Sequence, residues 1–418
     1  MKLVLPILLA WSLNVDAVSA AASAKIESSK KVVKMETPSL YPTAFASSLR
    51  GSFISTKTSA KGKITWSKPT GLAAANKYWP AAVLLWNKHQ VVTAHSEIVL
   101  FDPNGNKVWS KKKQIRAPLT VGGELLYFKN PSRFLDAIDI DGKKILDSGP
   151  FPGGMGENEV EFFFPRKDDF VAVMFDNDQR DHDQGDENPR PTRPILNLVK
   201  NRYSITYGDW LEKLDADDHL APLFLPEKSV LSLLSGGLHF RIDMNTEKRL
   251  SEVPVGFENP TEWSLDRNDV FYILATEKSQ LVMLAYRIEG MDLKNSKKKD
   301  QWRWESDPKY TEAWVAHPPA VGPSGKVYAL TTTRLIALEN GKLLWQNPVQ
   351  TAKDEMSFIS ILADESLLLA NGKVLSFLSP DGKLKWKVEV ASEILSSPVV
   401  DEVGNIFVTT ATDLVRIN

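Results

Sequence analysis

The sequence has no cysteine among its 418 residues. This absence excludes disulfide bonds, thiolate metal sites, haem attached through cysteine and a lipid anchor on an N-terminal cysteine. Net charge is also nearly absent, because 51 Lys and Arg stand against 52 Asp and Glu, which gives −1. A chain so balanced has no general attraction to nucleic acid or to anionic lipid, and we expect neither as a partner.

Long hydrophobic runs are missing as well. The most apolar stretch, residues 3–13, follows the positive charge of Lys2 and is too short to cross a bilayer. Small residues come next, with cleavage sites after Ala20 or Ala24, so residues 1–24 are predicted to be a secretory signal peptide. An uncleaved interfacial anchor is the alternative. The mature protein is then expected in the periplasm or outside the cell, without a transmembrane segment.

An internal repeat dominates the last hundred residues. Residues 319–328 align with residues 398–407 without a gap, and a third copy lies between them from Leu362 to Trp386. The period is about 40 residues, a length at which self-similarity indicates stacked supersecondary units. The sequence within one period predicts four short strands separated by turns, such as the Asn340-Gly341 hairpin signal. Four strands in about 40 residues match one blade of a β-propeller.

The repeat can be followed back along the chain. Blades are predicted at residues 81–109, 118–146, 160–207, 222–250, 260–304, 318–345 and 358–386. Residues 62–66 have the pattern of a last strand with no preceding three, while residues 398–418 supply three strands with no fourth. Pairing these two ends would close a ring and remove both free sheet edges.

The predicted fold is therefore all-β: an eight-bladed β-propeller over residues 62–418, preceded by the signal peptide. Residues 25–61 are rich in Ser, Lys, Thr and Ala and are expected to form a flexible leader. Seven blades remain the alternative, because the units at 160–207 and 222–250 are the least regular.

The turn and last strand of several units share one pattern. Residues 102–109, 339–345 and 379–386 each place a Gly four residues before a Trp. These segments resemble the tryptophan-docking repeat of PQQ-like propellers, in which the Trp packs between neighbouring blades. The residues that the resemblance makes structural are Trp66, Trp109, Trp345, Trp386, Gly105, Gly341 and Gly382.

This resemblance implies one of two kinds of protein. One is a quinoprotein dehydrogenase that holds PQQ and calcium. The other is a non-catalytic periplasmic scaffold, similar to the propeller subunit of the outer-membrane β-barrel assembly machinery. The chain lacks the adjacent cysteine pair of many such enzymes and the lipid-bearing cysteine of that subunit. The position before the Gly, which is Thr in that family, is Asn104, Asn340 or Asp381 here. The chain is therefore expected to belong to a divergent, non-catalytic branch without a lipid anchor.

Acidic residues cluster in an insertion within the unit at 160–207. Carboxylates alternate around Gly185, and Ca²⁺ binds six to eight such oxygens. A calcium site is one interpretation, and a solvated acidic loop is the other, since the spacing differs from that of an EF-hand. The candidate ligands are Asp181, Asp183, Asp186 and Glu187.

A basic insertion covers residues 291–300 in the unit at 260–304. Its lysines could contact an acidic partner, and a nearby Trp could anchor one, although solvated and core positions are the alternatives. The candidate partner-binding residues are Lys297, Lys298, Lys299 and Trp302.

Residues able to support catalysis do not form a recognisable set. The six His residues are scattered, and no nucleophile triad, phosphate-binding loop or zinc motif is present. We therefore expect a scaffold that binds a protein partner without catalysis, with no cofactor except a possible Ca²⁺. A PQQ- and Ca-dependent dehydrogenase or a small-ligand-binding propeller is the alternative.

Overall fold

The structure is a computed structural model of the chain. It describes residues 54, 56–71, 82–94, 97–112, 120–122, 124–129, 135–147, 159–165, 170–175, 194–197, 219–225, 228–235, 237–246, 248–257, 260–266, 268–278, 280–290, 292–308, 318–331, 333–349 and 357–418. The chain divides into two units, Met1–Ser39 and Leu40–Asn418, and every described residue lies in the second. The predicted signal peptide lies outside the described residues.

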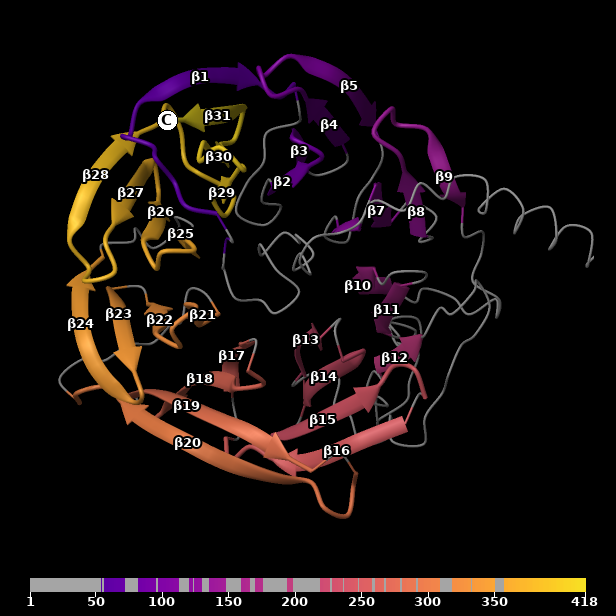
Figure 1. The fold of residues 1–418 in the computed structure, drawn as a ribbon, viewed down its shortest axis with the longest axis vertical. Coiled ribbons are helices and arrows are strands. Elements are labelled where there is room, and N and C mark those ends of the chain that lie inside the picture. Colours follow the sequence, from indigo (N-terminus) through magenta and orange to yellow (C-terminus); the bar gives the residue numbers. More distant parts are fainter. Residues whose placement is uncertain are drawn as a thin grey trace, which may run out of the picture. The chain divides into compact units, whose positions relative to one another are not determined.

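The described residues form only strands, turns and connecting segments, which confirms the all-β class (Figure 1). Among them, no helix is long and apolar enough to cross a membrane. The strands make eight antiparallel sheets, seven with four strands and one with three.

The strands of the first four sheets in chain order are β2 (Ala82–Trp86), β3 (His89–Ala94), β4 (Glu97–Phe101) and β5 (Lys107–Lys112); β6 (Thr120–Gly122), β7 (Leu125–Lys129), β8 (Leu135–Ile138) and β9 (Lys144–Asp147); β10 (Glu159–Pro165), β11 (Phe170–Phe175) and β12 (Pro194–Asn197); and β13 (His219–Leu225), β14 (Val230–Ser235), β15 (Leu238–Asp243) and β16 (Lys248–Pro254).

The strands of the remaining sheets are β17 (Pro260–Leu265), β18 (Phe271–Glu277), β19 (Gln280–Glu289) and β20 (Lys297–Glu305); β21 (Ala320–Val321), β22 (Val327–Leu330), β23 (Arg334–Glu339) and β24 (Lys342–Pro348); β25 (Ser357–Ile361), β26 (Leu367–Asn371), β27 (Val374–Leu378) and β28 (Leu384–Glu389); and β29 (Val399–Val400), β30 (Ile406–Thr409) and β31 (Asp413–Ile417) with β1 (Ile64–Pro69).

Burial differs between the strands of one sheet in the way that the sequence dictates. The second strand β22 reads Val-Tyr-Ala-Leu, and all four residues are buried. The fourth strand β28 alternates polar and apolar residues and is half exposed. Middle strands lie between two neighbouring sheets and need apolar residues on both faces, whereas the fourth strand forms an edge at the outside.

The sheets contact one another in a closed circuit (Figure 1). Each sheet packs on the next in chain order, through apolar clusters or through contacts between first strands, such as β6 with β10 and β21 with β25. The circuit is completed where the sheet of β29–β31 packs on both β25–β28 and β2–β5. First strands therefore face one another across the centre, and fourth strands lie at the periphery.

The two ends of the repeat region share one sheet. β1 pairs antiparallel with β31, with Trp66 opposite Arg416 and Lys68 opposite Leu414. Beyond the strand, Lys63 N donates to Asn418 O at 2.7 Å, and Asn418 N donates to Lys63 O at 2.8 Å. The last strand of this sheet therefore comes from the other end of the repeat region.

The packed part of the chain begins earlier than residue 62. Ile54 and Ala60 are buried in the cluster between β25–β28 and β29–β31. Ile54 N donates to Ile361 O at 2.7 Å, and Thr58 Oγ1 donates to Gly404 O at 2.6 Å. These contacts place the end of the predicted leader across two sheets, because its Ile and Ala fill apolar space there.

Candidate functional site

Tryptophans join five pairs of neighbouring sheets. In each pair, a Trp on a fourth strand lies against a Gly in the turn before the fourth strand of the next sheet. The pairs are Trp66 with Gly105, Trp109 with Gly142, Trp302 with Gly341, Trp345 with Gly382, and Trp386 with Gly62. A Cβ on Gly382 would lie 2.7 Å from Trp345 Cδ2, so no other residue type fits this contact without movement.

Three of these indoles also donate a hydrogen bond. Trp109 Nε1 donates to Ile140 O at 2.8 Å, Trp345 Nε1 to Pro380 O at 3.0 Å, and Trp386 Nε1 to Ala60 O at 2.8 Å. In each case the acceptor is the carbonyl two residues before the contacted Gly. The repeated geometry shows that these tryptophans fix the spacing between sheets, which is a structural task.

Trp302, a candidate partner-binding residue, belongs to the same set. Its ring is half-buried and lies 5.9 Å from the ring of Tyr272, and its Cβ contacts Gly341. The structure thus places it between sheets β17–β20 and β21–β24. Of the two interpretations, packing accounts for this residue.

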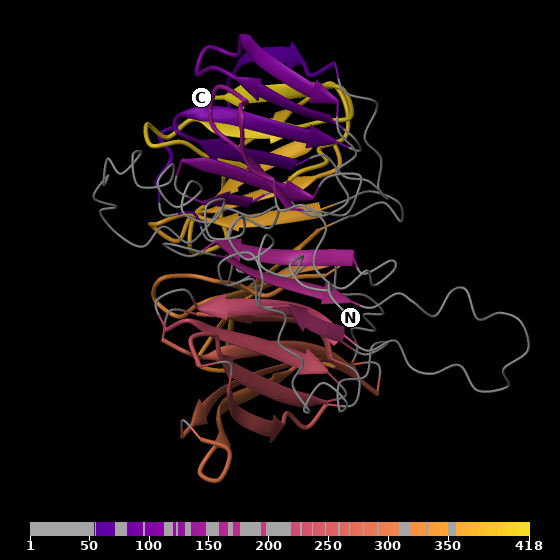
Figure 2. The ribbon, with the colours of Figure 1, turned by 90° about the vertical axis from the view of Figure 1, so that its right-hand side faces the viewer.

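The β19–β20 hairpin carries the other three candidates. β19 spans ten residues and β20 nine, so the hairpin is longer than the other hairpins described. Figures 1 and 2 both show its turn extending past the neighbouring strands. Residues 297–300 were expected within a loop, but they lie in β20, because Lys297, Lys298 and Lys299 pair with residues 287–289 of β19. The loop is therefore confined to residues 290–296.

Hydrogen bonds around Asp292 hold the turn of this hairpin. Asp292 Oδ1 accepts hydrogen bonds from Lys294 N and Asn295 N, each at 3.0 Å, and Ser296 N donates to Asp292 O at 2.9 Å. Gly290 has a φ of +88°, and a Cβ there would lie 2.5 Å from Asn295 O, so only Gly closes the turn. The turn presents Leu293, which is 46% exposed.

The three lysines of the hairpin differ in their surroundings. Lys297 and Lys299 are exposed, and their ammonium groups lie 3.8 and 2.7 Å from the carboxylate of Glu289. The hydrogen bond from Lys299 is the main cause that holds the pKa of Glu289 below its ordinary value. Lys298 is tucked inward instead: its Nζ donates to Val255 O at 2.9 Å and lies 5.8 Å from the ring centre of Tyr286.

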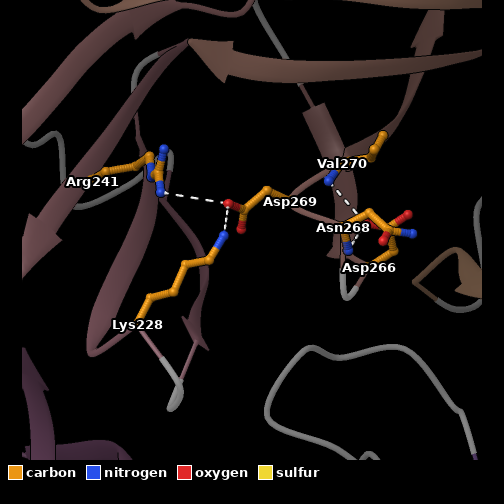
Figure 3. A network of polar contacts seen from close by, with 6 residues as sticks. All are labelled: Lys228, Arg241, Asp266, Asn268, Asp269 and Val270. Carbon is orange, nitrogen blue, oxygen red and sulfur yellow. Dashed lines mark hydrogen bonds and ion pairs between the residues drawn. The ribbon is translucent and has the colours of Figure 1, made fainter. Parts of the chain in front are cut away.

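Ion pairs, called clasps below, connect the turns that follow the first strands of neighbouring sheets. Lys326 Nζ lies 2.7 Å from Glu365 Oε2, and Lys228 forms an ion pair with Asp269 (Figure 3). Asp269 is positioned by Asp266, whose Oδ1 accepts from Asn268 N at 2.8 Å and Val270 N at 2.9 Å. Both acidic residues have positive φ, +65° for Glu365 and +61° for Asp269, a conformation that costs a non-Gly residue about 1–2 kcal/mol.

Metal ligands do not gather in the part of the chain that the structure describes. No group of three or more His, Asp or Glu residues there could hold a metal ion. The candidate calcium ligands Asp181, Asp183, Asp186 and Glu187 lie outside the described residues. Their interpretation therefore stays a prediction.

Neither Leu293 nor the clasps were predicted from the sequence. A single Leu inside a polar insertion is the signal that could have drawn attention to Leu293. The clasps left no such signal, because Lys228 and Asp269 are 41 residues apart and meet only after two sheets pack.

Comparison with known proteins gives a fold and no family. No protein-family model matches the chain, and no curated protein matches it. Among solved structures, the propeller of Dos1 superposes with a TM-score of 0.57 at 9% identity, covering 85% of this chain and 95% of that one. The computationally designed protein Ika8 superposes with a TM-score of 0.51 at 10% identity, covering 84% of this chain and 100% of that one.

Likeness at such low identity concerns the fold alone. Together with the closed circuit of antiparallel sheets, it shows a β-propeller-like fold for the repeat region.

Proposed function

We propose that this chain is an eight-bladed β-propeller scaffold that binds a protein partner through the β19–β20 hairpin and has no catalytic activity. The eight sheets of the described residues support the blade count, with the three-stranded sheet β10–β12 as one blade. The sequence features of residues 1–24 support secretion to the periplasm or beyond. The Gly–Trp contacts support membership of the divergent PQQ-like branch, since that family packs its blades in this way.

The observation that carries the proposal is the exposed Leu293 on a hydrogen-bonded turn. Apolar side chains at the tip of a preorganised turn can bury themselves in a partner without a cost for ordering the loop. Lys294, Lys297 and the carboxylate of Asp292 are exposed beside it, so the surface is apolar at its centre and carries both charges at its rim, with Lys in excess. Such a surface fits a partner with an apolar pocket edged by acidic residues.

The test is capture of a partner by the tagged mature protein from a periplasmic or culture extract. The variant Leu293→Asp with Lys297→Glu should lose the partner by at least tenfold while its melting temperature stays within about 2 °C, because both side chains are exposed. The matched control is Leu384→Asp, since Leu384 on β28 is exposed to a similar extent, 54% against 46% for Leu293. The control should keep the partner.

Two results would contradict the proposal. Equal capture by the hairpin variant and the wild type would place the interface elsewhere. Dye reduction by the purified protein that depends on added PQQ and Ca²⁺ would show a quinoprotein dehydrogenase instead of a scaffold.

A further inference from the structure

A single buried cation lies in the described contact between sheets β13–β16 and β17–β20. Arg241 on β15 is only 2% exposed, and its Nε and Nη2 have no hydrogen-bond partner. These two nitrogens form one planar edge of the guanidinium, the edge that holds a carboxylate through two parallel hydrogen bonds. Buried donors are rarely left unpaired, so this free edge needs an explanation.

Two buried hydroxyls flank the guanidinium. Ser232 on β14 and Ser251 on β16 are the cross-strand neighbours of Arg241 on either side. Both serines are fully buried, and neither hydroxyl has a hydrogen-bond partner. Cross-strand neighbours share one face of a sheet. Unpaired polar groups therefore form a row across three strands, on the face that packs against β17–β20.

The nearest carboxylate does not satisfy Arg241. Asp269 Oδ2 lies 4.0 Å from Arg241 Nη2, beyond hydrogen-bond distance, and is bonded to Lys228 (Figure 3). Asp269 thus shares one carboxylate between two cations, and Nε and Nη2 of Arg241 still lack a hydrogen-bond acceptor. Asp243, further along β15, accepts hydrogen bonds from Asn245 and Thr246 in its own turn.

The remaining titratable neighbour is neutral. His239 lies two residues before Arg241 on the same face, and its Nδ1 is 2.9 Å from Tyr286 Oη. Burial, and then the charge of Arg241, hold the pKa of His239 well below its ordinary value. His239 thus adds no positive charge, and the donors of Arg241 and of the two serines still lack an acceptor.

We propose that Arg241, Ser232 and Ser251 form a binding site for a carboxylate, which is reached when the Lys228–Asp269 ion pair parts. The side chains of Lys228 and Asp269 are 47% and 22% exposed, whereas Arg241 is 2% exposed. The carboxylate would receive the Nε and Nη2 hydrogen bonds and those of the two hydroxyls. A small free acid and the C-terminus of a peptide offer the same group.

The experiment measures the melting temperature and the binding heat of the purified chain with sodium acetate, against sodium chloride at equal ionic strength. A saturable rise with acetate and none with chloride is expected. A tripeptide with a free C-terminus is compared with its amidated form. Binding of the free form at least tenfold tighter than acetate identifies a polypeptide source, and similar affinities identify a small acid.

Variants locate the site. Arg241→Met keeps the buried volume and removes the two donors, so the acetate response should vanish while the protein without acetate melts no lower. Ser251→Ala should fold normally and weaken acetate binding about fivefold. This variant tests the site independently if Arg241→Met does not fold. Lys326→Gln is the matched control, because it breaks a clasp of the same kind, with Glu365, at another pair of sheets. It should leave the acetate response unchanged.

Three outcomes would overturn the proposal. A wild-type protein without an acetate response would mean that water satisfies Arg241. A response of equal size with chloride would mean a general salt effect. A response that persists in Arg241→Met would place the carboxylate elsewhere.

Discussion

At the residue scale, the contact of Gly382 with Trp345 shows how the sheets are spaced. Gly382 has a φ of +79°, which L side chains adopt only with strain, and the ring covers the place where a Cβ would be. Two requirements, one from the backbone and one from packing, thus select glycine at this position. The same pair of requirements recurs at four other sheet contacts.

Gly382→Ala should lower the free energy of unfolding by about 3 kcal/mol, because backbone strain adds to displacement of the indole. Gly325→Ala is the control: its φ is +87°, but a Cβ there meets no atom within 4 Å. The control should lose only the strain, about 1 kcal/mol. Urea denaturation measures both, and equal losses would show that the indole contact contributes nothing.

The tryptophans that follow a Gly by four positions were predictable from the sequence as contacts between sheets. The same role of Trp302 was not predictable. The fourth position before Trp302 is occupied by Lys298. Lys298 instead crosses to Val255 and lies near Tyr286, contacts that form only when β16 packs beside β20. Sequence spacing does not contain this information, because the contact depends on which sheets become neighbours.

At the element scale, the turn between β25 and β26 holds Glu365 in a strained conformation that places its carboxylate in an ion pair. Its carboxylate accepts from Lys326 Nζ at 2.7 Å and from Ser324 N at 2.8 Å, both in the preceding sheet. Burial alone would raise the pKa of Glu365, but these hydrogen bonds outweigh it and hold the pKa below its ordinary value of 4.5.

A pKa lowered by folding gives stability that is present above the unfolded value and is lost as pH falls through the folded value. The wild type should therefore lose free energy of unfolding as pH falls below about 4.5. Glu365→Gln should lose less over the same interval, since Gln cannot be protonated there. Urea midpoints between pH 7 and pH 3 measure the difference. Parallel curves for the two proteins would show that the clasp is not linked to protonation.

The length of the β19–β20 hairpin was not predictable from hydrophobic alternation. Polar, charged residues at 291–300 indicated a loop, yet half of them continue β20. Glu289 lies opposite Lys297 and also near Lys299, so opposite charges across the two strands support pairing without apolar residues. Hydrophobic alternation, the main signal for a strand, is absent from such a ladder.

At the scale of the whole molecule, the order of the strands follows from the repeat. Every predicted unit from residue 81 to residue 386 contains strands of a single sheet, and the sheets pack in chain order. Local repetition makes this arrangement predictable from the sequence, because the strands of each unit pair with one another and the unit packs on its neighbours. The Arg241 cluster was not predictable from the sequence, because its members come from three strands of one sheet and a turn of the next.

β1 and β31 close one circuit of sheets, which we expect to unfold as a single unit. The most direct test compares thermal unfolding of the chain lacking residues 1–69, which removes β1, with the chain lacking residues 1–53. Deletion of residues 54–69 uncovers the edge of β31, removes Trp66 from its contact with Gly105, and also removes the packed residues Ile54, Ala60 and Gly62. We expect the shorter chain to melt at least about 10 °C lower and over a broader range. Identical, equally sharp transitions for the two chains would contradict closure.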